Sequence, residues 1–157
     1  LSDILDTMLA EDKKLVIMAR FVPELNDIQK LLEKKNIGYA SVRGGISDRA
    51  EEIRKFQEDA DCRVFIGQIA AAGLGITLTT ASTMVFYSLD YSMSNFEQAK
   101  ARIHRVSQTE NCLYIYLIAK NTVDAKILRS LRDKVDLARI LVDDYRNGID
   151  PFQEKED

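Results

Sequence analysis

Five short apolar runs recur along this chain, and polar turns and helical patterns separate them. The runs are four to seven residues long and rich in branched and aromatic side chains, as is typical of strands buried on both faces of a sheet. They span Leu15–Ala19, Tyr39–Val42, Arg63–Gln68, Thr83–Leu89 and Leu113–Ala119. Strands that alternate with helices over short connections form a mainly parallel sheet with helices on both faces. The sequence therefore predicts one three-layer α/β domain.

Helical periodicity fills the intervals between these runs. Ser47 is the expected N-cap of the third helix. The last helix is long and stops before Gly148 and Pro151, and the tail over residues 148–157 is expected to fray. The helices are predicted over Leu1–Leu9, Phe21–Asn36, Asp48–Gln57, Asn95–Val106 and Val123–Arg146.

Composition limits the classes of function. A formal net charge of -3 argues against nucleic-acid binding by overall charge, but it does not exclude a local basic patch. No apolar run approaches the roughly 20 residues of a membrane span, so no membrane partner is expected. Because the chain begins at Leu1 inside a helical pattern and without an initiator Met, we expect it to be a fragment of a longer protein.

Histidine and cysteine are scarce. His104 is the only histidine, which excludes a multi-histidine metal centre, and we predict no metal-ligating residues. Cys62 and Cys112 lie far apart beside apolar runs, so buried free thiols are favoured over a disulfide. This usage fits a reducing, cytoplasmic setting.

Two arginines on the fourth predicted helix are the main candidates for chemistry. Gln98, Arg102 and Arg105 fall at i, i+4 and i+7, which predicts one polar stripe. The opposite face, which we expect to pack on the sheet, carries Phe96, Ala99, Ile103 and Val106. Such arginines are most often merely solvated. The nearby glycines Gly73 and Gly75, whose backbone can approach a ligand closely, favour an anion site instead, because a guanidinium fork suits phosphate.

Two common nucleotide-binding motifs are missing. A dinucleotide-binding fold carries G-x-G-x-x-G after its first strand, whereas Gly73 and Gly75 come late and Leu78 stands at the third glycine position. A P-loop needs G-x-x-x-x-G-K-[S/T], and no Gly-Lys pair occurs in the chain. The chain alone is therefore expected to hold no nucleotide tightly.

Longer motifs identify a family. Gln98–Gln108 (QAKARIHRVSQ) matches Q-A-x-x-R-x-H-R-x-G-Q, known as motif VI, and Phe65–Ala81 contains the A-G-x-G-x-x-L core of motif V. Tyr114–Ile127 matches a trailing strand followed by T-[IV]-[DE]-x-K-I. Together with Leu15–Phe21 and Val42–Arg54, these segments make nearly the whole chain resemble the second RecA-like lobe of helicase-superfamily ATPases, specifically Swi/Snf-type DNA translocases. The resemblance implies that residues 1–157 form one RecA-like helicase C-terminal domain.

The resemblance also implies partners and roles. In that family ATP lies between two lobes, the first lobe supplies the P-loop and a magnesium-binding acid, and motif VI of the second supplies arginine fingers. Arg102 and Arg105 would be these fingers, and Gln98, Gly73 and Gly75 would contact nucleotide. ATP and Mg²⁺ are thus expected in the intact protein, with the N-terminal RecA-like lobe of the same chain and duplex DNA as partners of a monomeric fragment. DNA contacts, mainly to phosphates, are expected from Arg43, Gly44, Ser47, Gln68, Thr77 and Thr79.

Several positions depart from the family pattern. Thr77 stands where Asn is usual, Ser107 where Gly is usual, and Ala101 where an acid commonly precedes the first arginine. Tyr91-Ser92-Met93 replaces Trp-Asn-Pro. These departures suggest a divergent branch, which we expect to be bacterial or phage-like and cytoplasmic, or nuclear if the source is eukaryotic.

Two other functions stay open on sequence alone. One is a strand-separating DNA or RNA helicase, against which the histidine between the two arginines argues. The other is a non-catalytic nucleic-acid-binding module that kept the fold and lost ATP turnover, for which Thr77 and the other departures argue.

Overall fold

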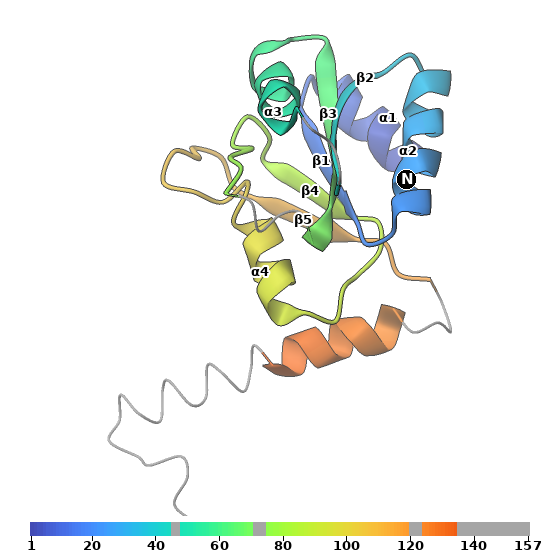
Figure 1. Ribbon diagram of the computed structural model, residues 1–157, viewed down its shortest axis with the longest axis vertical. Coiled ribbons are helices and arrows are strands. Elements are labelled where there is room, and N and C mark those ends of the chain that lie inside the picture. Colours follow the sequence, from blue (N-terminus) through green and yellow to red (C-terminus); the bar gives the residue numbers. More distant parts are fainter. Residues whose placement is uncertain (45–47, 71–74, 120–123, 135–157) are drawn as a thin grey trace, which may run out of the picture.

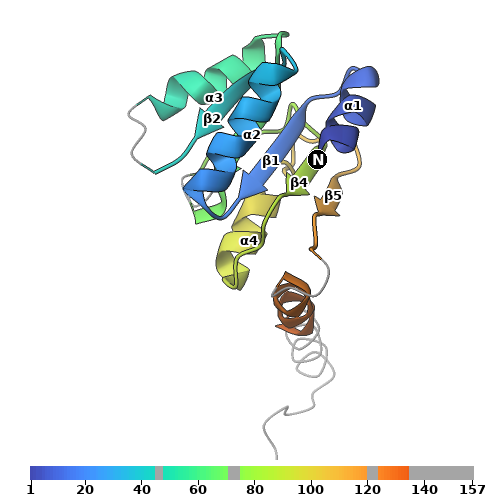
Figure 2. The same cartoon turned by 90° about the vertical axis from the view of Figure 1, so that its right-hand side faces the viewer.

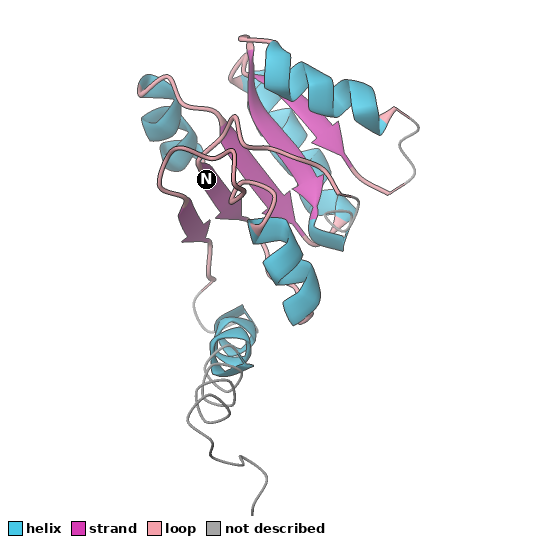
Figure 3. Ribbon diagram, turned by 90° about the vertical axis from the view of Figure 1, so that its left-hand side faces the viewer, coloured by secondary structure: helices cyan, strands magenta, loops and turns pink. Residues whose placement is uncertain are grey.

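A five-stranded parallel sheet forms the centre of the computed structural model, which describes residues 1–44, 48–70, 75–119 and 124–134. The strand order is β2-β3-β1-β4-β5, and every neighbouring pair is parallel (Figure 3). The strands are β1 (Leu15–Ala19), β2 (Gly38–Val42), β3 (Cys62–Gln68), β4 (Thr83–Phe86) and β5 (Leu113–Tyr116). The predicted α/β architecture and its parallel sheet are confirmed.

Helices cover both faces of this sheet (Figures 1 and 2). The labelled helices are α1 (Ser2–Ala10), α2 (Val22–Lys34), α3 (Arg49–Glu58) and α4 (Met93–Lys100). Helices α1 and α2 lie on one face, and α3 and α4 lie on the other, together with a helical segment over residues 124–134. None of the helices in the described part of the chain is long and apolar enough to cross a membrane.

Alternation along the strands divides the core into two layers. In β1 all five residues are buried. Val16 and Met18 join the hydrophobic cluster on the α3–α4 face, whereas Leu15, Ile17 and Ala19 join the cluster on the α1–α2 face. Successive side chains of a strand point to opposite faces, so a continuous apolar run is what a central strand between two helical layers requires.

Two strands are shorter than predicted. The apolar runs that continue to Leu89 and Ala119 leave the ladder at Phe86 and Tyr116. The Tyr87 backbone N–H still donates to the Met18 carbonyl at 2.8 Å, and a side chain continues the contact beyond it. The Ser88 hydroxyl accepts from the Arg20 backbone N–H at 2.8 Å and donates to the Glu24 carboxylate at 2.6 Å. Hydrophobicity predicted burial here correctly, but it did not predict the end of the ladder.

Smaller differences occur at element ends. Helix α3 has Asp48 as its N-cap, and the Asp48 side chain accepts from the Glu51 backbone N–H at 3.2 Å; Ser47, the expected cap, lies outside the described residues. Cys62 is a buried free thiol, as predicted, and Cys112 is a half-buried one. Burial raises the pKa of the Cys62 thiol. Of the long last helix, only 124–134 is described, and the expected tail over 148–157 lies outside the described residues.

Candidate functional site

Helix α4 ends before the two arginines, contrary to the prediction of a single helix from Asn95 to Val106. It stops at Lys100, and residues 101–112, here called the arginine loop, continue without regular helix or strand. The last turn tightens at Arg102, whose backbone N–H donates to the Ala99 carbonyl at 3.0 Å and whose carbonyl accepts from the Leu78 backbone N–H at 2.9 Å. Because the bond from Leu78 occupies the carbonyl that the next helical turn would use, the chain turns away at this point.

Both arginines reach the same backbone carbonyl. Arg102 donates from Nη1 to the Ile76 carbonyl oxygen at 3.5 Å, and Arg105 donates from Nη2 to it at 3.3 Å. Ile76, Leu78 and Ile103 all belong to the hydrophobic cluster on the α3–α4 face, so the two guanidinium groups lie over that face. The predicted convergence of the arginines is confirmed, although it comes from a loop and not from a helical stripe.

The two arginines differ in their surroundings. Arg102 is only 8% exposed, and its buried Nε has no hydrogen-bond partner among the described residues. Burial, and then the charge of Arg105, lowers the pKa of Arg102. Arg105 is exposed, and its second bond, from Nε to the Ala101 carbonyl, is long at 3.4 Å. Two cations that share one neutral acceptor leave positive charge uncompensated, and such a site favours an anion.

The other members of the predicted stripe lie elsewhere. Gln98 is exposed on α4, and its amide donates to Ser94 Oγ at 3.1 Å. No hydrogen bond joins it to either arginine within the described residues. Val106, which the sequence placed against the sheet, is fully exposed. The helical repeat failed for Val106 because the helix itself ends six residues earlier, at Lys100.

The segment over residues 75–81 runs beside the arginine loop without joining the sheet, so side chains satisfy its carbonyls. The Thr77 carbonyl accepts from Gln57 Nε2 at 2.9 Å. The Gln108 amide nitrogen lies 3.3 Å from the Thr79 carbonyl and 2.9 Å from the Ala81 carbonyl. Gly75 has a φ of 72°, a conformation that favours glycine, whereas Gly73 lies outside the described residues.

Other predicted polar groups meet at the carboxyl ends of β1, β2 and β3. Gln68 donates from Nε2 to the Arg20 carbonyl at 3.3 Å, and its Oε1 accepts from the Gly44 backbone N–H at 3.4 Å. Arg43 donates from Nη1 to Asn26 Oδ1 at 2.7 Å. The structure thus brings Arg43, Gly44 and Gln68 together, while Ser47 lies outside the described residues.

Thr79 lies apart from that group. Together with Lys13, Lys14 and Ser82 it lines a cavity of about 330 Å³ beside the amino ends of β1 and β4. Its hydroxyl lies 3.5 Å from Ser107 Oγ. The expected nucleic-acid contacts therefore lie at both ends of the parallel strands, some at the carboxyl ends and Thr79 at the amino ends.

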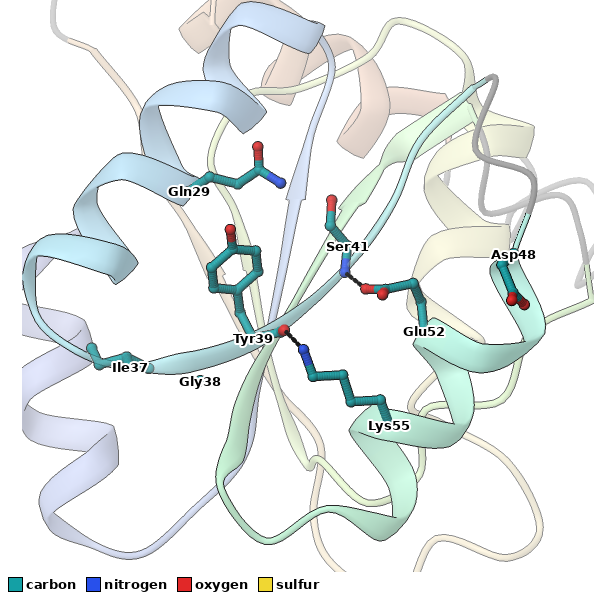
Figure 4. A pocket seen from close by; sticks show the side chains of 8 residues that line it. All are labelled: Gln29, Ile37, Gly38, Tyr39, Ser41, Asp48, Glu52 and Lys55. Atoms are coloured by element: carbon teal, nitrogen blue, oxygen red, sulfur yellow. Dashed lines mark hydrogen bonds between the residues drawn. The ribbon is translucent and has the colours of Figure 1, made fainter.

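A second cavity, of about 540 Å³, lies along the free edge of β2 (Figure 4). Glu52 and Lys55 of α3 reach the outward backbone groups of this edge strand. The Glu52 carboxylate accepts from the Ser41 backbone N–H at 2.6 Å, and Lys55 Nζ donates to the Tyr39 carbonyl at 2.9 Å. Covering an edge in this way blocks pairing with another strand.

Replacing Glu52 with alanine is expected to lower the free energy of unfolding of this chain by about 1 kcal/mol, because the Ser41 N–H loses its charged acceptor while water can enter the open cavity. Urea denaturation measures the change. Glu51→Ala is the matched control, since that exposed carboxylate pairs with the exposed Arg54 at 2.7 Å, and such pairs contribute little. Equal losses in both variants would contradict the proposed role of Glu52 at the edge.

Sequence reasoning missed two contributors to the site, the Ile76 carbonyl and Gln108. It also missed Gln57, which ties the adjoining segment to α3 without being part of the site. Gln108 lies inside the motif that was identified, but its acceptors lie far back in the chain, so spacing could not reveal them. No group of three or more His, Cys, Asp or Glu side chains that could hold a metal ion occurs in the described ranges.

Comparison with known proteins adds independent information. The model of the helicase conserved C-terminal domain family matches residues 1–107. The chain is 35% identical over 135 residues to the SWI/SNF-related matrix-associated actin-dependent regulator of chromatin subfamily A-like protein 1 of Drosophila melanogaster, which covers 85% of this chain and 18% of that protein. It is 29% identical over 158 residues to the chromatin-remodeling ATPase INO80 of the same species, covering 99% of this chain and 10% of that protein.

A solved structure agrees with these relatives. The C-terminal part of the Fun30 ATPase domain superposes with a TM-score of 0.78 at 28% identity, over 83% of this chain and 43% of that chain. The chain thus spans 18% and 10% of the lengths of the two curated relatives.

Proposed function

Because this chain belongs to the helicase conserved C-terminal domain family, we propose that it is the second motor lobe of an ATP-driven, Swi/Snf-type translocase on double-stranded DNA. The observation that carries the proposal is the convergence of Arg102 and Arg105 on the Ile76 carbonyl, in a loop tied to the segment that contains Gly75. Two guanidinium groups with unused donors and one neutral acceptor form a receptor for phosphoryl oxygens.

In this proposal Arg102 and Arg105 stabilise the transition state of ATP hydrolysis through their positive charge. Their guanidinium groups stabilise the negative charge that develops on the γ-phosphoryl oxygens during transfer, as arginine fingers do in related nucleotidases. The unpartnered, buried Nε of Arg102 fits this anion. ATP and Mg²⁺ would be held mainly by the first lobe of the intact protein, since no Gly-Lys pair of a P-loop occurs in this chain. Gly75 and the exposed Gln98 would border the nucleotide.

DNA would contact the sheet at the carboxyl ends of β1, β2 and β3. Arg43 uses one donor on Asn26, which leaves the rest of its guanidinium group for a phosphate. Among the described residues the Gly44 N–H donates only to Gln68 Oε1, over a long 3.4 Å, so a phosphate oxygen can compete for it. Gln68 would then act mainly by holding the Arg20 and Gly44 backbones in place at the carboxyl ends of the strands. Thr77 and Thr79 would each contribute a hydroxyl donor, because their carbonyls, which accept from Gln57 and Gln108, cannot donate to a phosphate.

The partners follow from the size of the chain relative to its relatives. The first lobe of the same protein would face the arginines, and this lobe would be monomeric by itself. The curated relatives named above are eukaryotic proteins described as a regulator of chromatin and a chromatin-remodeling ATPase. They favour the nucleus as the compartment of the parent protein, in place of the bacterial cytoplasm that the sequence departures suggested.

The proposal is tested by the ATPase rate of the full-length parent protein with and without duplex DNA. We expect DNA to stimulate turnover, with little separation of strands in a parallel unwinding assay. Strand separation would favour a helicase instead. No turnover in either condition would contradict a motor function and indicate a binding module.

A further inference from the structure

The arginine loop has little hydrophobic anchoring of its own. Ile103 is buried, whereas Ala101, His104, Arg105, Val106 and Ser107 are exposed. Without regular hydrogen bonding or much burial, polar ties must fix the position of such a loop. One tie lies at its start, between the Arg102 carbonyl and the Leu78 N–H.

Gln108 supplies several ties in the second half of the loop, where the Glu110 carboxylate also accepts from the Ser82 hydroxyl at 2.7 Å. Its amide nitrogen lies 2.9 Å from the Ala81 carbonyl, 3.3 Å from the Thr79 carbonyl and 3.2 Å from the Ile103 carbonyl. Its Oε1 accepts from the Glu110 N–H at 3.1 Å. One amide NH₂ has two hydrogens for these three carbonyl acceptors, so at least one hydrogen is shared between two carbonyls. The side chain therefore joins the two ends of the loop to the segment over residues 75–81.

The bonds of Gln108 also close a turn around Arg105. The Gln108 backbone N–H donates to the Arg105 carbonyl at 2.9 Å, and its side chain reaches back to Ile103. Arg105 thus lies within a ring of polar bonds that begins at Ile103 and ends at Gln108. From this geometry we propose that Gln108 is a positioning residue, which holds Arg105 at the distance and orientation that phosphoryl transfer needs.

This inference rests on the proposed function of Arg105. Misplacement of a reacting group by about 1 Å can cost about 10²-fold in rate. Replacing Gln108 with methionine, which is similar in length and lacks the amide, is therefore expected to lower the kcat of the parent protein for DNA-stimulated ATP hydrolysis by about 10- to 100-fold. The KM for ATP is expected to change little, because the first lobe supplies most of the nucleotide contacts.

Gln57→Met is the matched control. Gln57 also donates its amide to a carbonyl of the 75–81 segment, that of Thr77 at 2.9 Å, but it comes from α3, and within the described residues no hydrogen bond joins its side chain to the arginine loop. If Gln108 only stabilised the segment, both variants would lose similar amounts of thermal stability and of kcat. We expect the melting temperatures to fall together and the kcat to fall only in Gln108→Met.

A double-variant cycle on the parent protein completes the test. If Gln108 acts through Arg105, the double variant Arg105→Ala/Gln108→Met is expected to be no slower than Arg105→Ala alone. Multiplied losses in the double variant would overturn the inference, and so would a normal kcat in Gln108→Met. If the methionine variant folds poorly, Gln108→Asn, which keeps the amide on a shorter side chain, replaces it and is expected to lower kcat as well. Normal turnover in Arg105→Ala would overturn the proposed function itself, and the inference with it.

Discussion

Replacing Arg105 with alanine is expected to lower DNA-stimulated ATP turnover of the parent protein by about 10³- to 10⁵-fold, the range seen for arginine fingers. We expect Arg105 to exchange its partners more easily than Arg102 because it is exposed; the bond from Arg102 to the Ile76 carbonyl is just as long, at 3.5 Å, but Arg102 is buried. The bonds of Arg105 to Ile76 and Ala101 are long, at 3.3 and 3.4 Å. These weak bonds to neutral carbonyls are easily exchanged for stronger, charge-assisted bonds to a phosphoryl group.

Arg102→Ala is expected to lower the stability of the fold as well as ATP turnover, unlike Arg105→Ala. Arg102 is buried beside Ile76, so its loss leaves a space in the packed α3–α4 layer in addition to removing a charge. Both turnover and thermal stability should therefore fall in this variant, whereas Arg105→Ala should melt close to the wild type. Steady-state ATPase assays and thermal melts of the same preparations distinguish these outcomes.

Two variants serve as controls for Arg105. Arg105→Lys keeps the charge without the planar fork and is expected to recover only part of the activity. Arg54→Ala removes another exposed arginine, one that pairs with Glu51 and Glu58 on α3, and should leave turnover unchanged. A turnover in Arg105→Ala within a few-fold of wild type would contradict the finger role.

Local sequence patterns predicted the sheet well for physical reasons. β1 has the predicted bounds, because a five-residue apolar run between polar turns has few alternatives to a central strand. The end of α4 was missed because Ile103 continues the helical repeat and is buried as that repeat requires. The competing bond comes from Leu78, which is distant in sequence, and no local pattern contains it.

The site was predicted only as far as its residue types. Arg102 and Arg105 were identified from their spacing, and the structure confirms that they converge. Gln68 was predicted to contact DNA, and the structure adds that its amide joins β1, β2 and β3 at their carboxyl ends. Whether a polar side chain is available or already bonded depends on tertiary neighbours, which are not encoded in spacing along the chain.

Gly38→Ala is expected to give the largest loss of stability among conservative substitutions in the sheet. Gly38 begins β2, where the pairing with β3 shifts register between Gly38 and Tyr39. A Cβ at this position would lie within 3.0 Å of the carbonyl carbon and oxygen of Asp61. Because these are backbone atoms, the clash cannot be relieved by a side-chain rotation and must shift the strand. We expect a cost near the upper end of about 1–3 kcal/mol, measured by urea denaturation.

Gly44→Ala is the natural comparison, because it makes the same chemical change near the other end of the same strand. Within the part of the chain that the structure describes, a Cβ at Gly44 would meet only Gln68 Oε1, at 3.8 Å, which is an ordinary contact. Removing a glycine also reduces the freedom of the unfolded chain, an effect that stabilises by about 0.4–1 kcal/mol where the fold accepts alanine. The two variants should therefore change stability in opposite directions. Equal effects on stability would mean that β2 can shift relative to β3 at Gly38 at little cost. The close approach to Asp61 would then not require a glycine at the start of the strand.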